Sequence, residues 1–367
     1  MNKICMYTVC RNESSRIEAW WKSASEADKV AVIVHDCTDD TKEKLENLGA
    51  LVKETHYDIW RFDVGKNDAL NWAREIAPDC NILVYTALDE IFDPGWADKV
   101  RNKWTDNTIQ LEYNFVQTHD EDGNDLHQTK FNWIHSNEPN WYWKYPIHEA
   151  LIYDGDCSNR CTQNLFDEVK LNHWPDKTKK REYPELLELR YKEYKDHLSL
   201  LYLMIVYVQN QQYEKGLKLF EEYNIDENTL YQNEAAYLLL LEGLCHQGLN
   251  DYRSAKNTYQ SIIKYNIYPE YRDPYLNWAF MLSDMDCPYE ALALIKEAFA
   301  KTSRHFDWTE NPTYWNNAEL QLAASCCINL GEMSEALGFI EIYNYFNPGN
   351  TSLKEIEKNC LKDLLDE

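Results

Sequence analysis

The first hundred residues alternate short apolar runs with amphipathic segments of helical period. The apolar runs are short, β-branched or aromatic and bounded by polar turns: KICMYTV, VAVIVHD, ALVKETH and NILVYTA. Such runs are typical of buried strands. The segments between them keep apolar residues three to four positions apart, as amphipathic helices do: ESSRIEAWWKSA, DDTKEKLENLG and GKNDALNWAREIA. This alternation predicts a parallel sheet covered on both faces.

Polar loops follow the predicted strands. They are Arg11-Asn12-Glu13, residues 36–41, Gly65-Lys66-Asn67 and residues 87–90. Because parallel sheets bind ligands at the carboxyl ends of their strands, we expect these loops to meet in one cleft.

Residues 105–175 lose this alternation and are rich in aromatic residues. THDEDGND, residues 118–125, predicts the turn of a hairpin. Trp141, Trp143 and Tyr145 stand at alternate positions, as in a half-buried strand. Packing is therefore the first interpretation of these rings, and stacking on a sugar is the second.

From residue 181 the pattern is helical and weakly repeated. Four segments align on a small residue at their fourth position, at Gly216, Ala255, Ala291 and Ala336. Each follows another helical segment with large apolar residues, which is typical of tetratricopeptide (TPR) repeats, where the small residue lets two helices approach closely. We expect two domains, residues 1–180 and residues 181–367.

Composition narrows the classes of partner and location. The net charge of −25 disfavours nucleic acid, whose binding requires clustered Lys and Arg. Eleven cysteines without a CxxC pair indicate reduced thiols. The absence of a long apolar stretch argues against a transmembrane segment, and we expect a cytoplasmic protein.

Several motifs resemble those of family 2 glycosyltransferases of the GT-A fold. They are VCRNES, VHDCTDDT, GKNDAL and ALDE, each at or near the end of a predicted strand or the start of a helix. KYPIHEAL and LNHWPDK resemble segments of the bacterial subgroup that carries a helical-repeat tail. The resemblance covers nearly the whole chain. It implies an α/β GT-A domain, which is Rossmann-like, followed by an all-α TPR-like domain.

The resemblance implies a nucleotide-sugar donor, a UDP-sugar in the first instance. Arg11, Asn12 and Glu13 would lie beside the ribose and base, and Asp36 would accept hydrogen bonds from them. Lys66 and Asn67 stand where the family has Arg-Asn, near the phosphates or the base. The full set expected at the nucleotide is Thr8, Arg11, Asn12, Glu13, Asp36, Lys66, Asn67 and Leu88.

Family members usually carry Asp-x-Asp after the fourth strand, where it holds a divalent ion. Here the segment is Ala87-Leu88-Asp89-Glu90, so the first acid is absent. Asp89 keeps the position of the metal ligand, and His173 is expected to bind the metal or the diphosphate. Mn²⁺ and Mg²⁺ can keep water ligands, so one carboxylate together with a diphosphate is chemically sufficient.

The family inverts the anomeric carbon by single displacement, in which a carboxylate takes the acceptor proton. Glu149, with His148 beside it, is expected as the catalytic base. The competing acidic cluster is Asp120, Glu121 and Asp122. The helical repeats are expected to bind a protein or peptide acceptor. Self-association into a homo-oligomer is left open, as is a glycan acceptor.

The same residues have structural interpretations. Asp89 and Glu90 could cap a turn, Asn12 and Glu13 could cap a helix, and His148 could be an ordinary buried histidine. Ala87 also favours an alternative function, a catalytically impaired, transferase-like scaffold whose helical repeats bind a protein partner.

Overall fold

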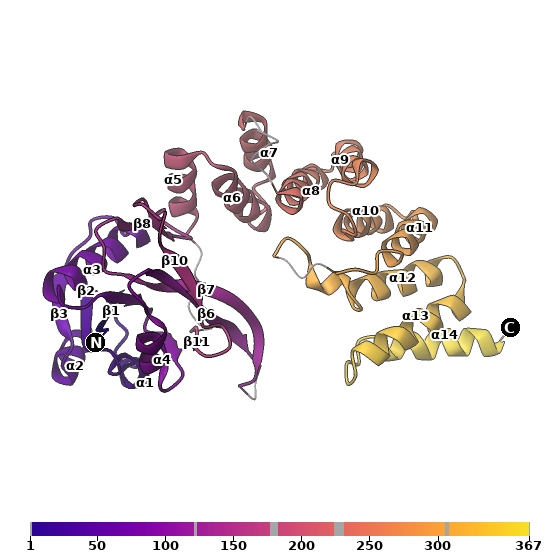
Figure 1. The fold of residues 1–367 in the computed structure, drawn as a ribbon. Coiled ribbons are helices and arrows are strands. Elements are labelled where there is room, and N and C mark those ends of the chain that lie inside the picture. The colour runs from indigo at the N-terminus through magenta and orange to yellow at the C-terminus, as the bar shows by residue number, and fades with distance from the viewer. Residues whose placement is uncertain (1, 121–122, 177–182, 224–230, 305–307, 367) are drawn as a thin grey trace. The chain divides into compact units, whose positions relative to one another are not determined.

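The computed structural model describes residues 2–120, 123–176, 183–223, 231–304 and 308–366. The chain divides into two compact units, Met1–Arg190 and Tyr191–Glu367 (Figure 1). The expected boundary between residues 180 and 181 lies outside the described residues.

The first unit is built on a nine-stranded sheet with the order β3-β2-β1-β4-β7-β6-β11-β5, and β10 pairs with β6. The strands are β1 (Ile4–Cys10), β2 (Lys29–His35), β3 (Leu51–Thr55), β4 (Ile82–Tyr85), β5 (Glu90–Phe92), β6 (Thr108–His119), β7 (Asp125–Ser136), β10 (Cys161–Asn164) and β11 (Lys170–His173). The first four strands pair in parallel, which confirms the four strands expected from the apolar runs.

Beyond β4 the sheet is mixed. β7 is antiparallel to both β4 and β6, and β5 is antiparallel to β11. The turn between β6 and β7 falls in THDEDGND, where Asp120 N–H donates to the Asn124 carbonyl at 3.0 Å. A turn this short joins only antiparallel strands. The predicted hairpin is therefore confirmed.

Helices cover both faces of this sheet. They are α1 (Ile17–Ala24), α2 (Thr41–Leu48), α3 (Phe62–Ile76) and α4 (Trp96–Lys103). Alternate residues of β1 enter two separate cores: Ile4 and Met6 pack with Trp20 of α1, whereas Cys5 packs with Leu70 of α3. The prediction of a sheet covered on both faces is confirmed.

A small second sheet pairs β8 (Trp141–Lys144) with β9 (Ala150–Tyr153). Trp141 and Trp143 are buried in the core beneath α3, and Tyr142 between them is exposed. The alternation expected for a half-buried strand is thus confirmed, and both Trp rings serve packing.

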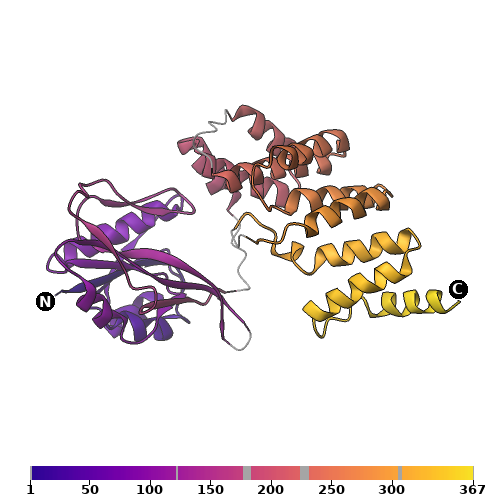
Figure 2. The same ribbon diagram turned by 45° about the vertical axis from the view of Figure 1, so that its right-hand side comes forward.

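The second unit is all helical. α5 (Pro184–Tyr194) runs across the boundary, and the helices that follow are α6 (His197–Gln209), α7 (Tyr213–Glu222), α8 (Gln232–Gly248), α9 (Tyr252–Tyr265), α10 (Asp273–Asp284), α11 (Pro288–Phe299), the 3₁₀ turn η1 (Pro312–Tyr314), α12 (Ala318–Asn329), α13 (Met333–Phe346) and α14 (Lys354–Asp366). Figure 2 shows successive helices of this unit stacked side by side. Within the described ranges, no helix has the length and apolar character needed to span a membrane.

The expected small residues lie where paired helices meet. Gly216, Ala255, Ala291 and Ala336 are all buried. A Cβ added at Gly216 would lie 2.7 Å from the Sγ of Cys245 in α8, so α7 approaches α8 too closely there for a larger side chain. The predicted pairing of helices around a small residue is confirmed.

Candidate functional site

A cavity of about 750 Å³ opens at the carboxyl ends of β1, β2 and β4. Its size is within the range of small-molecule sites. Its lining residues are Val9, Cys10, Arg11, Glu13, His35, Trp60, Phe62, Tyr85, Ala87, Leu88, Asp89, Tyr183 and Leu186. The loops after β1 and β4 thus meet in one cleft, as expected. The other two loops expected there, residues 36–41 and Gly65-Lys66-Asn67, are not among the lining residues.

Four residues expected at the nucleotide or metal line the cavity: Arg11, Glu13, Leu88 and Asp89. Arg11 is the only Lys or Arg among its described lining residues. Thr8 is fully buried in β1, and its Oγ1 has no hydrogen-bond partner in the part of the chain that the structure describes.

Asn12 and Asp36 tie neighbouring loops together. The Oδ1 of Asn12 accepts a hydrogen bond from the Thr38 N–H at 2.7 Å. The Asp36 carboxylate lies 2.5 Å from Nδ1 of His56 and 3.4 Å from Nδ1 of His35. The hydrogen bond from His56 lowers the pKa of Asp36. A nucleotide would therefore compete with these contacts for either side chain.

One wall of the cavity is aromatic. Trp60 stacks on His35 with ring centroids 4.3 Å apart, and the edge of Phe62 faces Trp60 at 5.4 Å. Tyr183 continues the wall beside Phe62 at 5.5 Å. A Cβ added at Gly65 would lie only 2.5 Å from Cη2 of Trp60, so the Trp ring occupies the space that this glycine leaves.

This aromatic wall is missing from the sequence-based predictions. Trp60 lies between β3 and α3, and Phe62 is the first residue of α3; both belong to HYDIWRFDVG, where the sequence has neither strand nor helix periodicity. The only available signal was the density of aromatic residues in a loop at the strand ends, which is where ligands bind.

Lys66 and Glu149 are brought together away from the cavity lining. Lys66 Nζ lies 2.5 Å from Glu149 Oε1, and the two side chains are 4% and 14% exposed. Burial alone would raise the pKa of Glu149, but the adjacent Lys66 ammonium overcomes burial and lowers it. Asn67 bonds the backbone of Trp143 with both ends of its amide, at 2.7 and 2.8 Å.

His148 stands next to Glu149 with a left-handed backbone, φ 49°. Burial lowers the pKa of its imidazole. Its carbonyl accepts a hydrogen bond from Nη1 of Arg190 at 2.9 Å. The catalytic roles of His148 and Glu149 stay predictions.

Asp89 and His173 face each other, with Asp89 Oδ2 3.6 Å from His173 Nε2. Burial would lower the pKa of His173, but the Asp89 carboxylate outweighs this and raises it. His173 Nδ1 lies 3.3 Å from the Gln117 carbonyl, which orients Nε2 toward Asp89. Two ligands of one ion stand at about this separation, so the pair fits a divalent metal whose other ligands are phosphate and water.

Glu90 accepts a hydrogen bond from the Ala87 N–H at 2.8 Å, so it does cap the turn. The competing acidic cluster is also engaged in a turn: the Asp120 carboxylate accepts hydrogen bonds from the backbone and side chain of Asn124. Glu121 and Asp122 lie outside the described residues.

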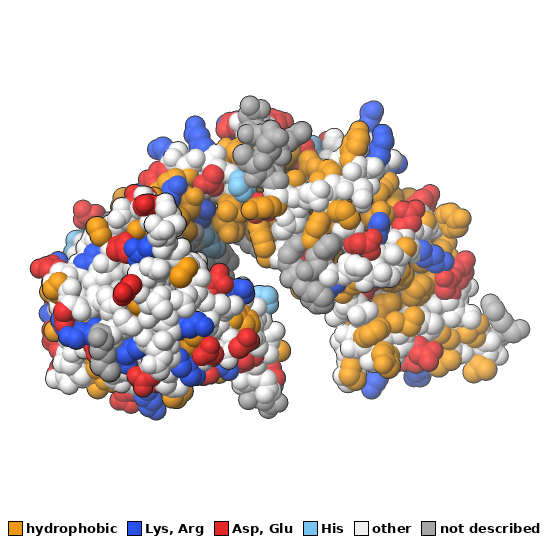
Figure 3. All heavy atoms as spheres, viewed as in Figure 1, with side chains coloured by type: hydrophobic (Ala, Val, Ile, Leu, Met, Phe, Trp, Pro, Cys, Tyr) orange, Lys and Arg blue, Asp and Glu red, His pale blue; other side chains and the backbone are white. Residues whose placement is uncertain are grey.

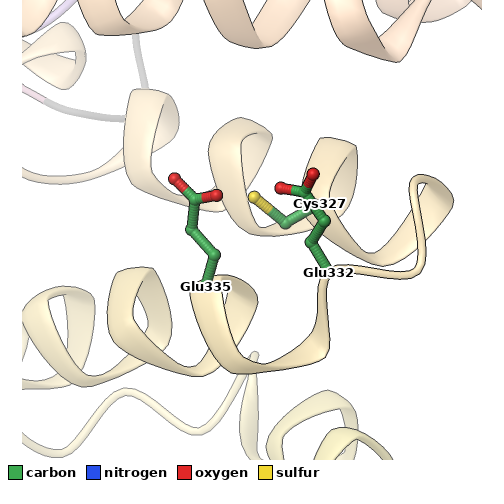
Figure 4. A group of neighbouring side chains, drawn as sticks. All are labelled: Cys327, Glu332 and Glu335. Carbon is green, nitrogen blue, oxygen red and sulfur yellow. The ribbon is translucent and has the colours of Figure 1, made fainter.

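Among the described residues, one group of three metal-ligating side chains lies within mutual reach, Cys327, Glu332 and Glu335 (Figure 4). It is in the second unit. Lys296 already pairs with Glu335 at 2.8 Å. Burial raises the pKa of Cys327 to about 12, so the thiol stays protonated at neutral pH. A protonated thiol and an occupied carboxylate make a poor metal site.

No protein-family model and no curated protein matches this chain. Similar solved structures include MamA, with 12% identity over 44% of this chain and 84% of that chain, at a TM-score of 0.34. TTC0263, a thermophilic TPR protein from Thermus thermophilus, has 16% identity over 48% of this chain and 88% of that chain, at a TM-score of 0.35. PilF from Pseudomonas aeruginosa has 12% identity over 48% of this chain and 72% of that chain, at a TM-score of 0.36. These low TM-scores carry no argument about function.

Proposed function

We propose that the first unit binds a nucleotide sugar, in the first instance a UDP-sugar, and transfers the sugar with inversion at its anomeric carbon. The observation that carries this proposal is the meeting of Arg11, Asp89 and the aromatic wall in one cavity of about 750 Å³. A nucleotide sugar has a flat base, an anionic diphosphate and a polar sugar. These suit an aromatic surface, a cation and hydrogen-bonding side chains, respectively.

Each side chain has a distinct task in this proposal. The aromatic wall of Trp60 and Phe62 receives the base, and Arg11 meets the phosphates. Asp89 and His173 would hold Mn²⁺ or Mg²⁺. Such an ion, when bound, neutralises charge on the leaving diphosphate.

The reaction is a single displacement. The acceptor oxygen or sulfur attacks the anomeric carbon as the bond from that carbon to the diphosphate oxygen breaks, and the acceptor proton goes to a carboxylate. Glu149 is the proposed base. Tyr85 lines the cavity and contacts Lys66, the partner of Glu149.

The test is binding and hydrolysis of a panel of UDP-sugars with Mn²⁺, for the wild type, Asp89→Ala and Asp98→Ala. Asp98 is an exposed acid of α4 that pairs with Arg101, so it controls for the loss of a carboxylate. We expect metal-dependent binding in the wild type and in Asp98→Ala, and its loss in Asp89→Ala. No binding or turnover of any nucleotide sugar by the wild type would refute the proposal.

A second candidate is the transferase-like scaffold that binds a protein partner. It is favoured by Ala87 in place of the family's acid, and by the hydrophobic side chains that gather over the second unit in Figure 3. Exposed hydrophobic side chains of this unit include Tyr289, 74% exposed, and Tyr345, 79% exposed. In the first proposal the same unit binds a protein or peptide acceptor. If Asp89→Ala and the wild type bind nucleotide equally, or neither binds it, the scaffold is favoured.

A further inference from the structure

The side chain of Lys66 lies in an aromatic cage. Its Nζ is 4.0 Å from the ring centroid of Tyr85 and 4.2 Å from those of Trp133 and Trp143. Glu149 Oε1 is 2.5 Å from the same nitrogen. Three aromatic faces and one carboxylate therefore surround an ammonium whose side chain is only 4% exposed.

The cage itself is held in place by buried hydrogen bonds. Trp143 Nε1–H donates to the Tyr7 hydroxyl at 3.1 Å, and that hydroxyl lies 3.0 Å from His135 Nε2. Burial lowers the pKa of His135 to about 3, so its ring is neutral. Its Nδ1 lies 2.9 Å from the Ser136 carbonyl and donates there, which leaves Nε2 to accept from Tyr7. Asn67 fixes the Trp143 backbone from the other side.

Lys66 cannot bind a ligand in the cavity without breaking its ion pair with Glu149. If the ammonium moved out to a phosphate, Glu149 would stay behind as a buried carboxylate without its counter-charge, which is strongly unfavourable. Arg11 already lines the cavity and can meet a phosphate without breaking such a pair.

We propose that Lys66 is a positioning residue: its caged ammonium holds Glu149 as an oriented carboxylate and leaves contact with the donor phosphates to Arg11. This rests on the proposed glycosyl transfer, because Glu149 is the proposed base of that reaction. It replaces the expectation, drawn from the family resemblance, that Lys66 lies near the phosphates or the base.

Other charged groups face Glu149 or its partner. His148 is adjacent in sequence, and Arg190 of α5 binds the carbonyls of Ile147 and His148. From the segment after β4, Glu90 interacts electrostatically with Lys66. Without Lys66, Glu149 would lose its counter-charge, and burial would favour protonation of its carboxylate.

The experiment compares two matched losses of positive charge, Lys66→Met and Arg11→Met. UDP affinity is measured with Mn²⁺ at pH 7.5, and the rate of donor hydrolysis or transfer is measured against pH. We expect Arg11→Met to weaken UDP binding by about tenfold or more, because it loses a charge-assisted contact. Lys66→Met should change this affinity by less than about threefold and move the acid limb of the rate profile upward by about one pH unit or more.

The opposite pattern would overturn the proposal. If Lys66→Met weakens UDP binding as much as Arg11→Met does and leaves the acid limb in place, Lys66 is a phosphate ligand.

A second measurement does not depend on the activity. The titration of Glu149 can be followed by ¹³C NMR of Glu-labelled protein, with Glu149→Gln identifying its signal. We expect the signal to titrate below the usual range of a glutamate in the wild type and above it in Lys66→Met. An unchanged titration in Lys66→Met would refute the positioning role even if the wild type binds no UDP, whereas absent UDP binding with a shifted titration would refute only the proposed glycosyl transfer.

Discussion

Gly65→Ala should destabilise the first unit, although replacing glycine by alanine inside a helix ordinarily stabilises a protein. The new Cβ would lie 2.5 Å from Cη2 and 2.7 Å from Cζ3 of Trp60. Carbon atoms in contact are about 3.5–4.0 Å apart, so the ring would have to move by about 1 Å.

The ring has little room to retreat. His35 stacks on Trp60 at 4.3 Å with the planes 6° apart, and the edges of Tyr57 and Phe62 each face it at 5.4 Å. Overpacking of this kind costs about 1–3 kcal/mol, against a gain of about 0.5–1 kcal/mol from removing a helical glycine. We therefore expect a net loss of up to about 2.5 kcal/mol.

The assay is urea unfolding followed by near-ultraviolet circular dichroism, which is sensitive to the packing of Trp rings. Gly338→Ala is the matched control, because a Cβ at Gly338 in α13 meets nothing within 4 Å. It should stabilise the second unit by about 0.5–1 kcal/mol. If Gly65→Ala were as stabilising as Gly338→Ala and left the spectrum unchanged, Trp60 would not be pinned against α3 as described.

Three further predictions concern the buried cores. Tyr7→Phe removes a hydroxyl that bonds both Trp143 and His135, so two buried polar groups lose their partner. We expect a loss of about 1–3 kcal/mol in the free energy of unfolding, measured in urea. An unchanged free energy would contradict the hydrogen-bonded chain. Because the pKa of His135 falls from 6.5 to about 3 on folding, its stability contribution is complete above pH 6.5 and is lost as pH falls toward 3, by about 1.4 kcal/mol per pH unit. Unfolding free energies measured at pH 7, 6 and 5 should show a shallower decline in His135→Gln than in the wild type, and equal slopes would exclude a neutral His135. Ala291→Leu should cost the second unit about 1–3 kcal/mol in thermal or urea unfolding, whereas Ala293→Leu, at an exposed position of the same helix, should be nearly neutral.

The parallel half of the sheet is predictable from the sequence because its signal is local. VAVIVHD is apolar at nearly every position, and in the structure Val30 and Val32 enter one core while Ala31 and Ile33 enter the other. A strand buried on both faces needs such a continuous run. The hairpin turn and the paired helices are predictable for the same reason, since turn residues and helical periodicity lie within short segments.

The Lys66–Glu149 pair is not predictable in this way. It forms because β8 returns the chain to α3, where Asn67 bonds the Trp143 backbone and places the following turn beside Lys66. Periodicity gives no information on contacts between residues so far apart in sequence. Asp89 and His173, expected at one metal, do lie 3.6 Å apart, although their role stays a prediction.

The close approach of Gly216 to Cys245 has an evolutionary consequence for the repeats. At the equivalent position the other three repeats carry alanine, but here the thiol stands 2.7 Å from where a methyl group would be. Alanine is therefore accessible at 216 only after Cys245 has become smaller, for example through Cys245→Ala, and the reverse order passes through a clash. The effect of each substitution therefore depends on whether the other is already present. This repeat can acquire the alanine of the other three repeats only when the two substitutions occur in one order.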